Sequence, residues 1–263
     1  MRNLLLAAFI SVSLFACTKS KESKTLSPRP LGKGEFFDES TGSKTAILSI
    51  LKTDSGKTAD ADRFAIAFKD TVLSVENAQK IANSKFIKAR YINSQKTAIL
   101  AQVDDQMGTL SPLYIFNLKN GSVEAVNINR ISNGKNDRKF TKGIEDLTVT
   151  YLLVNNDYVI NVVNGKVYTL TRENDAERIQ GKFFMYSSDK TTLLFVTDKA
   201  FYQTNYRTGE SSVLAVPAKV LQATDLNSEI QSNYVWSKNA KGTEFLKKGA
   251  DDDRIVDISE FKQ

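Results

Sequence analysis

Apolar and polar residues alternate in short stretches along the chain, and the clearest of these stretches occurs twice. Tyr114 to Gly121 reads Tyr-Ile-Phe-Asn-Leu-Lys-Asn-Gly, and Tyr202 to Gly209 reads Tyr-Gln-Thr-Asn-Tyr-Arg-Thr-Gly. Both copies have an aromatic residue first, Asn three positions later and Gly four positions after that Asn. Alternation with a period of two indicates a strand, and Gly tolerates the positive φ of a tight turn. Together with the strands that follow, at 122–128 and 211–216, the pattern predicts a repeated β-hairpin.

These hairpins belong to larger units of four strands. The clearest unit has expected strands at 86–91, 97–103, 113–118 and 122–128. Earlier strands are expected at 45–51 and 64–68, a third unit at 147–179, a fourth from Phe183 and a weaker fifth from Tyr234 to Ile258. The stretch 77–83 is compatible with one or two helical turns. Four antiparallel strands in about 40 residues is the size of a propeller blade.

The spacing of the repeats supports a regular architecture. Thr45 and Thr97 are 52 residues apart, and Tyr114 and Tyr202 are 88 apart, which is two steps of 44. The stretch Tyr186-Ser-Ser-Asp-Lys-Thr-Thr-Leu-Leu-Phe195, followed by Tyr206-Arg-Thr-Gly-Glu210, resembles the WD40-like propeller repeats of TolB-type periplasmic proteins. The resemblance implies an all-β fold of four-stranded antiparallel units, with room for about five blades. An antiparallel β-barrel or sandwich built from the same hairpins is the alternative.

The N-terminus has the features of a secretory signal. Arg2 precedes an uncharged run from residue 4 to 15, which is about a dozen residues and shorter than the roughly 20 that span a membrane. Leu14-Phe15-Ala16-Cys17 resembles the bacterial lipobox, which implies cleavage before Cys17 and a lipid on its thiol. We therefore expect a signal peptide at 1–16, a lipid-anchored flexible tether at 17–43 and the all-β domain at 44–263. The resemblance also favours the outer membrane where the source is Gram-negative, because Thr18 follows the cysteine at the position where an Asp would tend to retain a lipoprotein in the inner membrane.

Composition removes several classes of chemistry. The chain of 263 residues has no His and only one Cys, so it offers no imidazole base, no His-rich metal shell and no intramolecular disulfide. The formal charge of +6 is spread over the chain without a long basic run, which argues against a nucleic-acid partner. We expect no cofactor and no catalytic residues.

Several acidic and aromatic residues are candidate site residues, but their pattern is more typical of a structural role. Asp60 and Asp62, Asp104 and Asp105, and Asp251 to Asp253 lie in predicted loops without the spacing of a calcium loop or of paired catalytic carboxylates. Aromatic residues recur at strand positions, where core packing is the commoner role. They are Tyr91, Tyr114, Tyr168, Phe201, Tyr202 and Trp236.

Two functions remain open from the sequence. The first is a membrane-anchored envelope lipoprotein whose non-catalytic β-propeller-like domain binds or scaffolds an envelope protein or polymer. The alternative is a hydrolase that acts on envelope polysaccharide or peptide with carboxylates alone. A carrier of a small ligand in a barrel cavity is a third possibility.

Overall fold

The computed structural model describes residues 22–38, 46–53, 62–103, 112–134 and 143–249. Strand accounts for 52% of the described residues and helix for 6%, so the predicted all-β class is confirmed. Cys17 and the expected signal peptide lie outside the described residues, as do Asp60, Asp104, Asp105 and Asp251 to Asp253.

The first two units share one curled sheet that forms a half-barrel. Unit 1 is β3 (Leu48–Thr53), β4 (Arg63–Phe68) and β5 (Thr71–Glu76), and unit 2 is β7 (Phe86–Tyr91), β8 (Ala98–Val103), β9 (Leu113–Lys119) and β10 (Ser122–Asn127). Both β3 and β7 pair with β4, which joins the units. The stretch 77–83 is not helical, because it forms a turn and the short strand β6 (Ala82–Asn83).

Units 3 and 4 are separate four-stranded antiparallel sheets in which each strand pairs with the next along the chain. Unit 3 is β11 (Ile144–Thr148), β12 (Tyr151–Val154), β13 (Tyr158–Asn161) and β14 (Val167–Thr169). Unit 4 is β15 (Lys182–Tyr186), β16 (Thr192–Val196), β17 (Ala200–Asn205) and β18 (Ser211–Ala215). The register shifts within the β11–β12 and β15–β16 pairs, where each unit has a bulge.

The repeated hairpin occupies equivalent places, as the sequence predicted. Tyr114 lies on β9 and Tyr202 on β17, and each strand is the third of its unit. A further copy lies midway: Tyr158-Val-Ile-Asn161-Val-Val-Asn164-Gly165 begins 44 residues after Tyr114 and 44 before Tyr202. It forms β13, the third strand of unit 3. The step of 44 residues is therefore the distance between corresponding strands of neighbouring units.

The last described segment, 216–249, differs from the predicted fifth blade. Two helices, α1 (Ala218–Leu221) and α2 (Leu226–Asn233), precede a hairpin of β19 (Tyr234–Lys238) and β20 (Glu244–Lys248). The side chain of Asp225 caps α2 by accepting a hydrogen bond from the Ser228 N–H at 3.1 Å. The hairpin was predicted, but the helices were not. The rest of the expected fifth unit, 250–258, lies outside the described residues.

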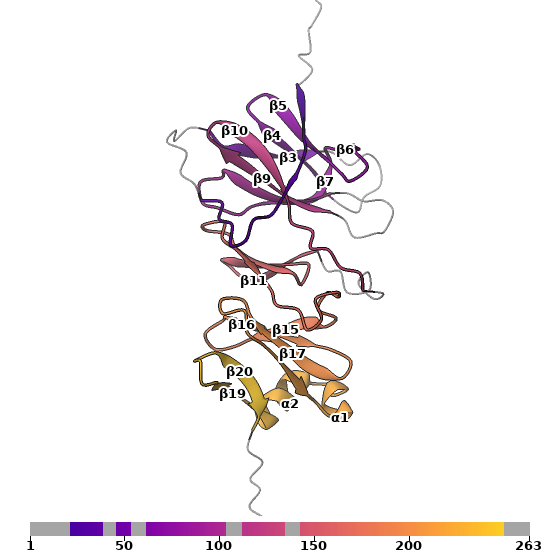
Figure 1. Cartoon of the computed structure of the whole chain (residues 1–263), viewed down its shortest axis with the longest axis vertical. Helices are drawn as coiled ribbons and strands as arrows, with labels where there is room; N and C mark the ends of the chain where they lie inside the picture. The colour runs from indigo at the N-terminus through magenta and orange to yellow at the C-terminus, as the bar shows by residue number, and fades with distance from the viewer. Residues whose placement is uncertain (1–21, 39–45, 54–61, 104–111, 135–142, 250–263) are drawn as a thin grey trace, which may run out of the picture.

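The sheets of units 2 to 4 are buried on both faces, because alternate residues of a strand point to opposite sides. On β12, Leu152 and Val154 pack against unit 2, whereas Leu153 packs against unit 4. On β16, Leu193 packs towards unit 3 and Leu194 towards the helices and the last hairpin. Figure 1 shows the result, a stack in chain order with β19 and β20 at the end opposite to β5. This arrangement confirms four-stranded units but does not confirm a closed propeller.

Residues 22–37, which we call the N-terminal strap, are folded, so the prediction of a flexible tether is wrong for this part of 17–43. The strap includes β1 (Ser23–Leu26), which pairs in parallel with β5, and β2 (Arg29–Pro30), which pairs in parallel with β10. It ends with Phe37, whose N–H donates to the Gly165 carbonyl at 3.3 Å. The strap thus runs along the outer strands of units 1, 2 and 3 in turn.

Candidate functional site

Four turns from units 2, 3 and 4 meet at one end of their sheets and form a continuous surface, which we call the turn rim. They comprise residues 93–97, 161–166, 187–191 and 205–209. The first two are joined by a bridge between Asn93 and Asn164. The last two are joined by the Asn205 side-chain amide, which donates to the Thr191 hydroxyl at 2.8 Å. The contact between the tyrosine rings of 168 and 206 connects the two pairs of turns, at 5.1 Å between ring centroids.

Each turn of the rim carries one cation that lies over a tyrosine ring. Charge-to-centroid distances are 5.6 Å for Lys96 and Tyr91, 5.1 Å for Lys166 and Tyr168, 6.0 Å for Lys190 and Tyr186, and 6.0 Å for Arg207 and Tyr206. All four cationic residues are exposed, and none forms an ion pair within the described part of the chain. The rim therefore presents four cations outside ion pairs, with one exposed carboxylate, that of Asp189, among them.

The rim is stiffened at its centre by a tyrosine cluster between units 3 and 4. Tyr206 packs against Tyr151 at 5.7 Å and against Tyr168. Burial, with the neighbouring Tyr151 adding to it, raises the pKa of Tyr206 to about 12. Burial also acts to raise the pKa of Tyr151, but hydrogen bonds with Asn161 and Arg207 outweigh it and leave that pKa below its ordinary value. The hydroxyl of Tyr151 is thus held against the Arg207 guanidinium.

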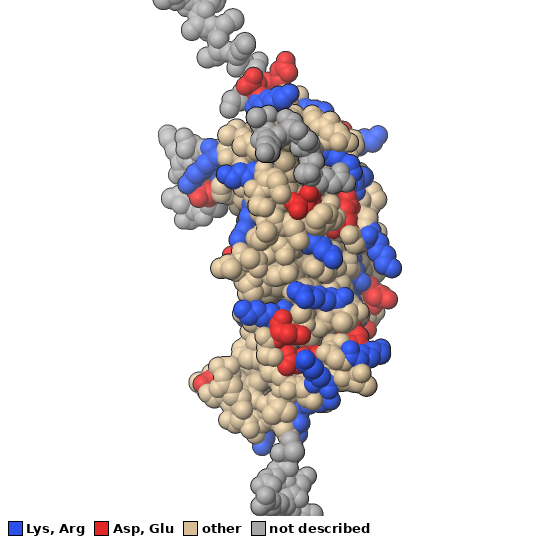
Figure 2. Space-filling model, turned by 90° about the vertical axis from the view of Figure 1, so that its left-hand side faces the viewer, with Lys and Arg blue, Asp and Glu red and all other residues tan. Residues whose placement is uncertain are grey.

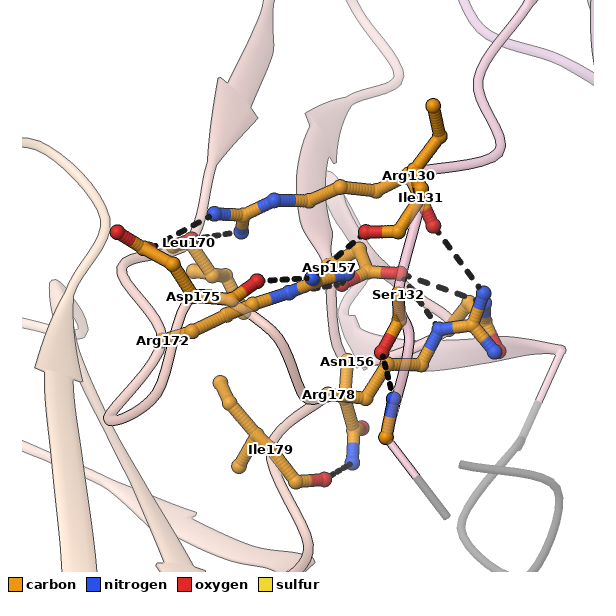
Figure 3. A network of polar contacts seen from close by, with 12 residues as sticks. Arg130, Ile131, Ser132, Asn156, Asp157, Leu170, Arg172, Asp175, Arg178 and Ile179 are labelled. Carbon is orange, nitrogen blue, oxygen red and sulfur yellow. Dashed lines mark hydrogen bonds and ion pairs between the residues drawn. The ribbon is translucent and has the colours of Figure 1, made fainter. Parts of the chain in front are cut away.

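A second polar group is buried between units 2, 3 and 4 (Figure 3). Asp157 lies in the turn between β12 and β13, where Asn155 and Asn156 both have positive φ, at 54° and 55°. Its carboxylate accepts hydrogen bonds from Arg172 Nη2 at 2.8 Å and from Arg178 Nε at 3.0 Å. The side chains of Asp157, Arg172 and Arg178 are 1%, 1% and 4% exposed. Two guanidinium groups therefore share one carboxylate away from solvent.

This arginine network fastens the linkers between units. Arg172 also donates to the Ile131 carbonyl at 2.9 Å, and Arg130 donates to the Leu170 carbonyl at 2.6 Å. The segment after β10 is thereby joined to the loop that connects units 3 and 4, as Figure 3 shows. The cavity beside Arg178 and Tyr202 has a volume of about 40 Å³, which is room for about one water. A carboxylate enclosed in this way has a structural role.

The described aromatic candidates divide between core and surface. Tyr114, Phe201 and Tyr202 are 3%, 0% and 1% exposed and pack in the core, as predicted. Tyr91 and Tyr168 are half-buried beneath cations of the turn rim. Trp236 is half-buried and packs against the hydrophobic core between unit 4, the two helices and the last hairpin. Asp62, the described member of the acidic pair, forms an exposed ion pair with Lys52 at 2.7 Å.

The sequence contains one sign of the rim, because the pair Lys-Thr recurs at residues 96–97 and 190–191. The structure shows that both lysines close a turn, with φ of 59° in each case. A lysine in the left-handed region is uncommon, and its recurrence marks a repeated turn.

Neither a metal site, nor a membrane-spanning helix, nor a similar protein was found for the residues that the structure describes. Among the residues that the structure describes, no group of three or more acidic or Cys side chains could hold a metal ion. No helix within the same ranges is long and apolar enough to cross a membrane. Comparisons with protein-family models, curated proteins and solved structures found no match.

Proposed function

We propose that this chain is an exported lipoprotein, anchored to the cell envelope through a lipid on Cys17, whose stack of propeller-type β units binds an acidic envelope component without catalysis. Where the source is Gram-negative, the outer membrane is the proposed location. The stacked repeats and the turn rim are the features that support binding, because repeat stacks offer extended surfaces to their partners.

The rim carries this proposal, since it places four cations without described ion-pair partners on rigid turns of adjoining sheets. The tyrosine rings beneath them limit side-chain motion, so less conformational entropy is lost when a partner binds. Figure 2 shows basic side chains along the length of one face of the molecule, with acidic side chains among them. An acidic polymer or protein of the envelope is the partner that the rim would attract.

The strap sets how close such an anchor would be to the domain. β1 begins at Ser23, six residues after Cys17. Extended chain spans at most about 3.6 Å per residue, so these residues reach about 22 Å. A lipid on Cys17 would therefore hold unit 1 near the membrane surface, and the stack would extend from there towards β19 and β20 (Figure 1).

The anchor is tested by replacing Cys17 with Ser and labelling cells with an alkyne-bearing fatty acid. We expect the wild-type chain to be labelled and to sediment with membranes, whereas Cys17→Ser is unlabelled and released. An unlabelled wild type, or a variant that stays equally membrane-bound, contradicts the anchor.

The rim is tested with two variants of equal charge. One changes Lys96, Lys166, Lys190 and Arg207 to Gln, and its control changes Lys80, Lys182, Lys199 and Lys219 to Gln, all of them exposed. Binding to cell-envelope fragments is measured over a range of salt concentrations. We expect the rim variant to lose most of the binding and its salt dependence, and the control to keep both. Equal losses would show that net charge, and not the rim, determines binding.

A further inference from the structure

The backbone of the strap pairs with the outer strands of units 1, 2 and 3. In unit 1, the N–H of Val72 donates to the Glu22 carbonyl of the strap at 2.8 Å. In unit 3, the N–H of Val167 donates to the Glu35 carbonyl at 3.2 Å. Val72 and Val167 hold the same position, two residues after the turn that leads into the outer strand of the unit. Unit 2 is covered by β2, which pairs with β10.

Side chains reinforce this cover along the strap. Arg29 donates to Glu124 of β10 through Nε and Nη2, both at 2.9 Å, and to Glu35 at 3.1 Å. Ser27 donates to Glu76 at the end of β5 at 2.7 Å. The outer edges of three successive units are thus closed by an extended segment of the chain itself.

The corresponding edge of unit 4 is open in the described structure. Its outer strand is β18, and Ser211 holds the position that Val72 and Val167 hold in units 1 and 3. The Asn205 N–H donates to the Glu210 carbonyl, and the ladder with β17 continues from this pair, so Ser211, Val213 and Ala215 direct their backbone groups away from β17. No described strand pairs with that side of β18.

β18 also lacks the features that usually protect an open edge. Proteins protect such edges with bulges, charged residues or proline. The opposite edge strands of units 3 and 4, which are β11 and β15, each contain a register shift. In contrast, β18 pairs with β17 without a shift, and its sequence Ser-Ser-Val-Leu-Ala has neither charge nor proline. Val213, at its centre, is 50% exposed.

We propose that the open edge of β18 binds an extended segment of a partner protein, which adds to unit 4 as the strap adds to units 1 to 3. The partner's backbone pairs with Ser211, Val213 and Ala215, and one of its apolar side chains packs on Val213. This mode of binding is the one by which the strap pairs with β5 and β10, where backbone pairing provides most of the contact. This site is separate from the turn rim and does not depend on the proposed anchor.

The test uses the full-length chain and a displayed library of short random peptides as the probe. Peptides selected on the wild type are then measured against Val213→Lys and Val213→Pro, which add a charge or remove an outward N–H at an exposed position. Val149→Lys, at a residue that is 90% exposed in a turn of unit 3, is the control. We expect selected peptides to lose at least about tenfold in affinity for both Val213 variants and to bind the control unchanged.

Backbone amide exchange gives a second readout. Because one net hydrogen bond corresponds to about a fivefold change in an equilibrium constant, we expect a bound peptide to slow exchange at Ser211, Val213 and Ala215 at least that much. Ser212 and Leu214, which already face β17, should change less. If no selected peptide depends on Val213, or protection does not alternate along β18, the proposal is overturned. Self-association that Val213→Lys abolishes would instead make a second copy the occupant, which also overturns it.

Discussion

Replacing Asp157 with Asn tests the arginine network most severely, because it removes one charge and almost no volume. In the wild type, the Asp157 carboxylate pairs with Arg172 and Arg178, and all three side chains are at most 4% exposed. In the variant, both buried guanidinium groups lose the negative charge that they share. Breaking a buried ion pair by removing one partner costs about 3–5 kcal/mol. Single domains are commonly stable by only about 5–15 kcal/mol, so the loss would be a large fraction of the total.

The assay is urea unfolding, followed by circular dichroism and by the fluorescence of Trp236, the one tryptophan of the chain. Asp175→Asn is the matched control, because Asp175 is 96% exposed and 3.8 Å from Arg130. We expect the control to change the free energy of unfolding by less than about 0.5 kcal/mol. A loss below about 1 kcal/mol for Asp157→Asn would show that the buried arginines do not need this carboxylate, and it would refute the reasoning.

Two further predictions concern the strap and alkaline pH. Phe37→Ala should lower the free energy of unfolding by about 3–5 kcal/mol, since this ring is 1% exposed in the core between units 2 and 3. Tyr202 is 1% exposed, and burial raises its pKa from 10.0 to about 12. The unfolded chain therefore loses this proton first as pH rises, and stability that is complete below pH 10 should fall by about 2–3 kcal/mol by pH 12. Urea unfolding, at neutral pH and across the alkaline range respectively, measures both.

Each of these predictions has a control. The neighbouring Phe36 is 45% exposed, so Phe36→Ala should cost far less than Phe37→Ala, and equal costs would argue against the strap. Tyr202→Phe should reduce the loss of stability between neutral and alkaline pH while also lowering stability at neutral pH, because the Tyr202 hydroxyl donates to the Thr171 carbonyl at 2.6 Å. An unchanged alkaline slope in this variant would assign the effect to other groups.

The strands could be predicted because their determinants are local. Period-two alternation and the turn at Asn120 and Gly121, where φ is 49° and 75°, mark hairpins directly in the sequence. The same frame at Tyr158 lies within the predicted third unit, 147–179, and ends at the turn of Asn164 and Gly165. Each of these features depends on residues that are close together along the chain.

The strap and the arginine network could not be predicted in the same way. Pro28, Pro30 and scattered polar residues give the strap no hydrophobic period, and it is held by backbone pairing with strands about 50 to 100 residues away. The members of the network are similarly distributed, with Arg172 15 residues and Arg178 21 residues from Asp157. Local pattern likewise contains no information on whether stacked units close into a ring, because both arrangements bury the same alternating faces.

The strap and the open edge of unit 4 are tested together by amide hydrogen exchange of the free, full-length chain. Val72, Val167 and Ser211 hold equivalent positions, but only the first two donate to the strap, at 2.8 and 3.2 Å. We predict that the amides of Val72 and Val167 exchange at least about tenfold more slowly than that of Ser211. Comparable rates at the three positions would contradict a strap that covers units 1 to 3 and leaves unit 4 open.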